Sequence, residues 1–184
     1  FRKSPKSVIA KTYWARVLLN RGESGEAEKL SRETYEIYPD FVSNLNLLAE
    51  MEKRKKNLKE AEFYLERALA LRPLNQETLT ALSRVYFSRG KYRQTNRILE
   101  TLVPRYGGEG NIVLFAVSQM KTGNYQEGIK TIRRYFRENP ENETLTAVIN
   151  YGNLKLGNLE ALGRLYNAAV VRRRFSEVVS LFAD

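Results

Sequence analysis

A spacing of 34 residues recurs along this chain of 184 residues and restricts its fold more than any other feature. The prolines that end successive segments are Pro5, Pro39, Pro73 and Pro140. A second position of the period is held by Gly22, Lys56, Gly90, Gly123 and Gly157, with steps of 34, 34, 33 and 34 residues. A spacing kept over the whole length indicates repeated supersecondary units rather than one irregular core.

One period, residues 40–75, shows what each unit contains. In its first half, the residues at helical spacing are Leu45, Leu48, Ala49 and Glu52. Only Glu52 interrupts this apolar set. Its second half has an apolar set at the same spacing: Leu58, Ala61, Leu65, Ala68, Leu69 and Leu71. Residues 53–57 between them are too charged to bury, and Pro73 disfavours further helix. The period therefore predicts two antiparallel helices joined by a polar turn.

A helix–turn–helix unit of this length, repeated with small residues at matching places, resembles the tetratricopeptide repeat (TPR) family over nearly the whole chain. The resemblance implies an all-α, right-handed α-solenoid of about five helical hairpins plus a C-terminal capping helix. The single array spans residues 1–184, with units at about 8–40, 41–74, 75–108, 109–141 and 142–174 and the capping helix at 175–183. In an alternative division of the tail, residues 172–174 are the turn of a last unit.

Several residues test this division. Trp14 and Leu18 are core candidates of the first unit. The two helices of a hairpin should approach most closely at Ala27, Ala61, Thr95 and Gly128. Pro104 comes earlier than the period requires, so the glycine-rich residues 107–110 are expected to replace it as the end of the unit and to form a linker.

The beginning and composition of the chain add further expectations. Residues 1–5 align with the last helical turn before Pro39 and Pro73, which predicts a segment of a longer protein. No apolar run is long enough for a membrane span, and no secretory leader is visible. The compartment cannot be read from the sequence. A net charge of +10 favours acidic partners, nucleic acid or an anionic membrane surface.

Catalysis finds little support in the residue types. The chain has no cysteine and no histidine, which removes thiol nucleophiles, the usual zinc sites and the commonest general base. Glu60 and Glu62 stand among lysines, which indicates a solvated helix surface. The glycines at 107–110 lack the lysine of a phosphate-binding loop. We therefore expect no enzyme activity, no cofactor and no metal.

The family resemblance implies that the first helix of each unit lines a concave groove that binds a peptide or helix of a partner. Carried over unit by unit, the predicted lining is Thr12, Arg16, Asn46, Glu50, Thr80, Arg84, Phe87, Val113, Val117, Met120, Tyr151 and Leu154. It is polar at its N-terminal end and apolar at its C-terminal end. The apolar part either holds a partner's apolar anchors, packs against the next helix, or mediates self-association.

A basic patch is the second candidate surface. It comprises Lys130, Arg133, Arg134, Arg137, Arg172, Arg173 and Arg174, and its first four members share one helix face. Such a face is typical of a solvated helix and also fits a polyanion or an anionic membrane surface, although no aromatic residues alternate with it for base stacking. The sequence thus predicts a non-enzymatic protein–protein interaction scaffold. One alternative is a contact of the basic patch with a polyanion or an anionic membrane surface. Another is an accessory module of a larger membrane-embedded glycosyltransferase-like enzyme, since residues 3–22 resemble the entries into repeat arrays that follow membrane-embedded sugar transferases.

Overall fold

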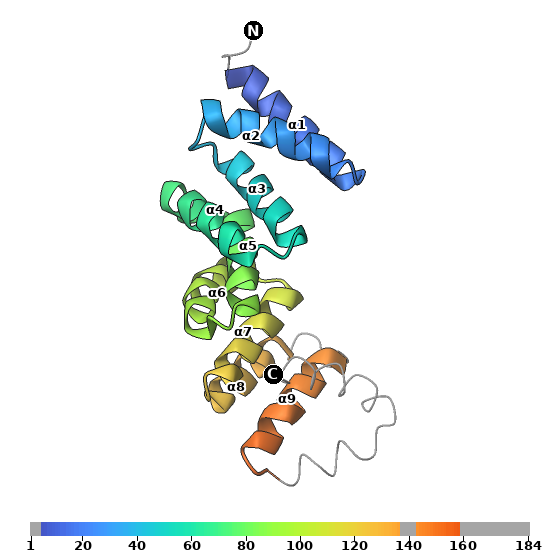
Figure 1. The fold of residues 1–184 in the computed structure, drawn as a ribbon. Coiled ribbons are helices and arrows are strands. Elements are labelled where there is room, and N and C mark those ends of the chain that lie inside the picture. Colours follow the sequence, from blue (N-terminus) through green and yellow to red (C-terminus); the bar gives the residue numbers. More distant parts are fainter. Residues whose placement is uncertain (1–4, 137–142, 159–184) are drawn as a thin grey trace. The chain divides into compact units, whose positions relative to one another are not determined.

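A computed structural model of the chain describes residues 5–136 and 143–158, and every regular element in these residues is an α-helix (Figure 1). The helices are α1 (Pro5–Asn20), α2 (Ser24–Ile37), α3 (Val42–Arg54), α4 (Leu58–Leu71), α5 (Gln76–Ser88), α6 (Tyr92–Tyr106), α7 (Glu109–Lys121), α8 (Tyr125–Phe136) and α9 (Glu143–Lys155). An all-α fold of helical hairpins is therefore confirmed. The predicted capping helix and about half of the fifth predicted unit, residues 142 and 159–174, lie outside the described residues.

Left-handed turns close the hairpins at the second position of the period. The backbone φ angle is positive at Gly22, Lys56, Gly90, Gly123 and Gly157. Glycine adopts this conformation without steric cost, whereas Lys56 holds a φ of 64° with a side chain attached. The same backbone bond recurs beside the turns, since the amide of Glu23 donates to the carbonyl of Leu18 and that of Asn57 to the carbonyl of Glu52. The recurrence makes residues one period apart structurally equivalent.

The chain forms two compact units, residues 1–89 and 90–184, which we describe separately. In the N-terminal unit each of the helices α1 to α4 packs on the next. Helix α1 also contacts α3, and α3 contacts α5, whereas α2 and α4 make no contact with each other among these described helices. The first helices of the successive hairpins, α1, α3 and α5, therefore form an inner layer. Their exposed side is here called the first-helix surface.

The C-terminal unit repeats this arrangement over its described helices. Helix α6 packs on α7, α7 on α8 and α8 on α9, and α7 also contacts α9. Gly128 is the point of closest approach, because a Cβ atom there would lie 2.8 Å from the carbonyl oxygen of Ala116. The expectation of a small residue at this place is confirmed. Ala27, Ala61 and Thr95, at the corresponding places, are also fully buried.

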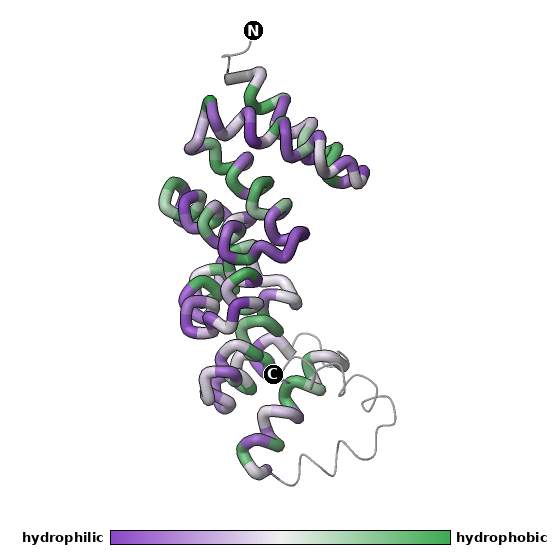
Figure 2. The backbone as a smooth tube through the Cα atoms, viewed as in Figure 1, coloured by the Kyte–Doolittle hydropathy of each residue, from purple (hydrophilic) through white to green (hydrophobic). Residues whose placement is uncertain are grey.

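Hydrophobic and hydrophilic segments alternate along the helices, as expected where each helix buries one side (Figure 2). The fully buried large side chains include Leu18, Leu45, Leu65 and Leu82 of the N-terminal unit. Within the described residues, no helix combines the length and the apolar character that a bilayer crossing demands.

Two sequence predictions about this architecture are wrong. Trp14 was expected in the core, but its side chain is 51% exposed, because none of the helices in residues 5–136 and 143–158 covers that side of α1. The end of α6 agrees with the sequence, because the helix continues past Pro104 to Tyr106 and ends where Gly107 turns with a φ of 57°. The length of the linker does not agree. The expected linker shrinks to Gly107 and Gly108, since α7 begins at Glu109.

Candidate functional site

The first-helix surface of the N-terminal unit carries an ion pair that reaches across it. Arg16 of α1 donates to Glu77 of α5 at 2.8 Å, although α3 lies between these helices in the inner layer. Both side chains are close to half exposed. The pair therefore links α1 to α5 at the surface and leaves both charges accessible to a partner.

Glu50 of α3 is the acidic centre of the same surface. It accepts from Lys53 and from Arg54, the latter at 3.1 Å. Partial burial raises the pKa of the Glu50 carboxyl, but the hydrogen bonds from Lys53 and Arg54 outweigh it and hold the pKa below its usual value. Arg54 also donates to the carbonyl of Leu19 at 3.0 Å, which ties α3 to the end of α1. Glu50 is thus a fixed, ionised part of the surface.

Helix α5 contributes a cation, Arg84, to this surface. Arg84 is exposed and makes no ion pair among the described residues. Thr80 precedes it by four residues and Phe87 follows it by three, so the three side chains lie on one helix face. Both neighbours are half-buried. An accessible guanidinium beside an aromatic ring is suited to an acidic group that is followed by an apolar side chain.

Two predicted groove residues, Thr12 and Asn46, lie beneath this surface instead of on it. Both are about 4% exposed, and they are equivalent positions of α1 and α3. The Asn46 side-chain oxygen accepts from the Thr78 hydroxyl at 2.9 Å, so this amide joins α3 to α5. Burial removes both residues from the accessible lining, which corrects their assignment, and Asn46 also helps to hold the inner layer together.

The apolar end of the predicted groove is mostly core. Val117 and Met120 of α7 are each about 1% exposed, and Tyr151 of α9 is also buried. Met120 fills the space beside Gly128 and Gly152, because a Cβ atom added to either would lie within 3 Å of its side chain. Packing against α8 and α9 thus removes these residues from the surface. Val113 is half-buried, and Leu154 remains exposed.

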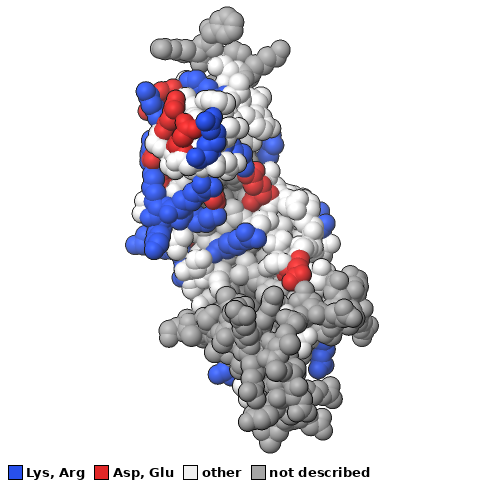
Figure 3. Space-filling view, turned by 90° about the vertical axis from the view of Figure 1, so that its right-hand side faces the viewer, with Lys and Arg blue, Asp and Glu red and all other residues white. Residues whose placement is uncertain are grey.

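Charged residues also join successive hairpins, and the sequence analysis did not predict these contacts. Glu52 is buried and accepts from Arg32 at 3.4 Å, Lys55 at 3.2 Å and Asn57 at 2.8 Å. Glu28 accepts from Lys55 at 2.7 Å. Oppositely charged side chains of the N-terminal unit can be seen beside one another in Figure 3.

The hydrogen bonds from Lys55, and then from Arg32, hold the pKa of Glu28 below its usual value. Glu62, expected on a solvated surface, is buried and pairs with Arg89. That expectation failed because Arg89 lies 27 residues along the chain, beyond any local charge pattern.

The basic patch is placed only in part. Lys130, Arg133 and Arg134 are exposed on α8, and Lys130 lies 3.6 Å from Glu127. With Asn153 and Leu156 they border a hollow of about 480 Å³. Arg137, Arg172, Arg173 and Arg174 lie outside the described residues.

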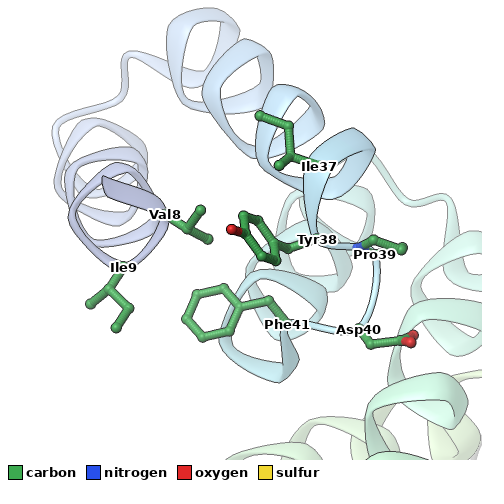
Figure 4. Close-up of a pocket in the computed structure, with 7 residues that line it drawn as sticks. All are labelled: Val8, Ile9, Ile37, Tyr38, Pro39, Asp40 and Phe41. Atoms are coloured by element: carbon green, nitrogen blue, oxygen red, sulfur yellow. The ribbon is translucent and has the colours of Figure 1, made fainter. Parts of the chain in front are cut away.

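An apolar hollow of about 400 Å³, which the sequence reasoning missed, lies at the start of α1. Val8 points toward the rings of Tyr38 and Phe41, whereas Asp40 points away (Figure 4). Ile9 and Ile37 complete its apolar lining, and both are partly exposed. Among the residues that the structure describes, no group of three His, Cys, Asp or Glu side chains is placed to hold a metal ion.

Comparisons with known proteins agree with this architecture. The family model for "Anaphase-promoting complex, cyclosome, subunit 3" matches residues 54–135. No curated protein matches the chain. Among solved structures, YrrB, described as a TPR protein with an unusual peptide-binding site, has a TM-score of 0.81 at 17% identity over 90% of this chain and 87% of that one.

A second solved protein is MamA. The form from Desulfovibrio magneticus RS-1 that begins at its residue 41 has a TM-score of 0.77 at 15% identity and covers 97% of this chain and 96% of that one. The AMB-1 form has a TM-score of 0.75 at 16% identity and covers 98% of each chain. Similarity at such low identity establishes the shared fold, a solenoid of helical hairpins.

Proposed function

We propose that this chain, a tetratricopeptide repeat protein, is a non-enzymatic scaffold whose first-helix surface binds a segment of a partner protein. The fold supports a role in protein–protein interaction, and the similar protein YrrB is described as having a peptide-binding site. The observation that carries the proposal is the exposed Arg84 beside Phe87 on that surface, which makes no ion pair with any residue that the structure describes.

The chemistry of this surface suggests the partner's features. Arg84 can take a carboxylate in a bidentate pair, and Phe87 can take an apolar side chain one helical turn away. Glu50 and the Arg16–Glu77 pair offer both signs of charge elsewhere on the first-helix surface. We therefore propose a partner segment that contains an acidic residue close to an apolar one, with polar residues around them.

Site-specific photo-crosslinking tests this proposal. A photoreactive amino acid replaces Thr80, which lies one turn from Arg84, in the full chain expressed in its native host. The same group at Lys59, an exposed position of the second helix α4, is the matched control. We expect position 80 to crosslink to one partner protein that position 59 does not reach, and we expect Arg84→Glu to abolish that crosslink.

Lys59→Glu serves as the charge control, since it introduces the same change outside the first-helix surface. Equal crosslinking from positions 80 and 59 would contradict the proposal. Crosslinking that survives Arg84→Glu and is lost with Arg133→Glu would instead assign binding to the basic residues of α8.

A further inference from the structure

Three charged residues of the first-helix surface occupy the same position of the period. Arg16 of α1, Glu50 of α3 and Arg84 of α5 follow one another at intervals of 34 residues, and each is at least partly exposed. Because α1 contacts α3 and α3 contacts α5, equivalent residues of these helices are neighbours on the surface. Arg16, Glu50 and Arg84 therefore form a row of alternating charge across the three helices, here called the charge row.

The charge row does not hold its own helices together. Within the part of the chain that the structure describes, no member of the row pairs with another: Arg16 binds Glu77, and Glu50 accepts from two cations of its own helix. Arg84 makes no ion pair with any described residue. The carboxylate of Glu50 has about four acceptor sites, so it can accept from a partner as well. All three charges are thus open to complementary groups.

Glu77 shows how a carboxylate reaches the charge row. It belongs to the first turn of α5, and its side chain meets Arg16 of α1 at 2.8 Å, although α3 lies between these helices. The N-terminus of α5 favours a carboxylate at this place in any case, so Glu77 keeps a favourable position when Arg16 binds another acid. The two side chains are 40% and 48% exposed, and a partner's carboxylate can therefore exchange with Glu77.

The same ion pair limits the width of the occupant. Side chains of α1 and α5 meet across α3, so the opposite sides of the surface lie within the reach of two side chains. An α-helix is about 10–12 Å across with its side chains, which is more than this arrangement accommodates. An extended segment is narrower and fits between the charged groups.

The spacing of the charge row selects one extended conformation. Packed helices lie about 8–10 Å apart, which sets the interval between neighbouring charges of the row. In a polyproline II segment, three residues complete a turn at about 3.1 Å each, so every third side chain returns to the same side after about 9 Å. In a β-strand, side chains on one side recur after about 7 Å. The polyproline II interval matches the row, whereas the β interval falls short of it.

We propose that the first-helix surface binds an extended segment in polyproline II conformation whose every third side chain is charged, in the order acidic, basic, acidic. The inference rests on the proposed function and deepens it, since it specifies the charge order and the conformation of the partner. The outer acids pair with Arg84 and with Arg16, which exchanges Glu77 for one of them. The central base pairs with Glu50, and an apolar residue beside the acid at Arg84 contacts Phe87.

Selection from a random peptide library tests the charge order on the full chain. The peptides are long enough to hold three charges at three-residue intervals or at the seven-residue intervals of a helix. We expect the parent chain to enrich acidic, basic and acidic residues at every third position. Glu50→Lys should change the central preference from basic to acidic, and Arg84→Glu should remove the preference for an acid beside an apolar residue. Lys59→Glu, the control on α4, should keep the preferences of the parent.

Binding of the selected peptide gives the magnitudes. Moving its central base by one residue turns that charge away from Glu50 and should weaken binding by up to about fivefold, the effect of a partly exposed ion pair. Glu77→Gln in the chain should strengthen binding by up to about fivefold, because Arg16 loses the carboxylate that competes for it. Circular dichroism of each variant checks that its helices remain.

The possible failures can be told apart. Peptides whose capture depends on Arg84 but whose central preference is the same for the parent and Glu50→Lys would overturn the inference and leave the proposed function standing. Charges at seven-residue intervals would also overturn it, because the occupant would then be a helix. A selection that yields no peptide dependent on Arg84 would contradict the inference and the proposed function together.

Discussion

The close approach of α7 and α8 at Gly128 gives a quantitative prediction for Gly128→Ala. A Cβ atom at this position would lie 2.7 Å from Cγ of Met120 and 2.8 Å from the backbone oxygen of Ala116. The methionine side chain can rotate away, but the carbonyl can move only if α7 moves. Overpacking of this kind costs about 1–3 kcal/mol.

Part of that cost is offset, because alanine favours helix over glycine by up to about 1 kcal/mol, and less in a first helical turn. We therefore expect Gly128→Ala to lower the free energy of unfolding by about 1–2 kcal/mol. For a chain of this length, the corresponding decrease in melting temperature is roughly 2–8 °C.

Gly25→Ala is the matched control, since Gly25 lies near the start of α2 and a Cβ there would meet no atom within 4 Å. Urea denaturation and thermal melts followed by circular dichroism measure both variants. We expect Gly25→Ala to be neutral or slightly stabilising. If Gly128→Ala behaves in the same way, the packing of α7 against α8 described above is wrong.

Three further predictions concern turns, caps and charges. Lys56→Gly should raise the free energy of unfolding by about 1 kcal/mol, because glycine adopts the left-handed conformation of this turn without steric strain. A urea titration that shows a lower free energy of unfolding would refute this. Asn75→Ala should lower the free energy of unfolding by about 1 kcal/mol, since the Asn75 side chain caps α5 by accepting from the Thr78 amide at 2.9 Å. An unchanged urea midpoint would count against that cap. Because the folded-state pKa of Glu28 is lowered, its contribution to stability should be complete above its ordinary pKa of 4.5 and should disappear as pH falls through the folded-state value. Glu28→Gln should remove this part of the acid sensitivity in melts at several pH values, and an unchanged pH profile would exclude it.

The hairpin architecture could be predicted from the sequence because it rests on local signals. The left-handed turns fall where the period has glycine or Lys56, and Gly128 is small where two helices meet. Each of these signals depends on one residue and its immediate helix. A period kept over the whole chain then makes the individual assignments support one another.

The composition of the surface was harder to predict, because it depends on which side of a helix a neighbour covers. Successive side chains of a helix point about 100° apart. An error of one residue in the assumed register therefore assigns core residues to the surface. Val117 and Met120 were therefore expected on the surface and are buried. Trp14 shows the opposite error, because its position is buried in the later hairpins and uncovered in α1.

Buried charges were missed for a related reason. Glu62 lies among lysines in the sequence. Its ion-pair partner Arg89 follows it by 27 residues and lies directly after α5, in the next hairpin. Such a partner becomes visible only when equivalent positions are compared, since Glu28 and Lys55 form the same pair one period earlier. The period thus contains information on tertiary contacts that local charge patterns lack.

The most direct test of the central claim is the affinity of the crosslinked partner segment for three forms of the full chain: the parent, Arg84→Glu and Lys59→Glu. A hydrogen-bonded charge pair contributes about 1.5–3 kcal/mol, so Arg84→Glu should weaken binding by at least about tenfold. Lys59→Glu should bind as the parent does. Equal affinities for all three forms would contradict a role of the first-helix surface in partner binding.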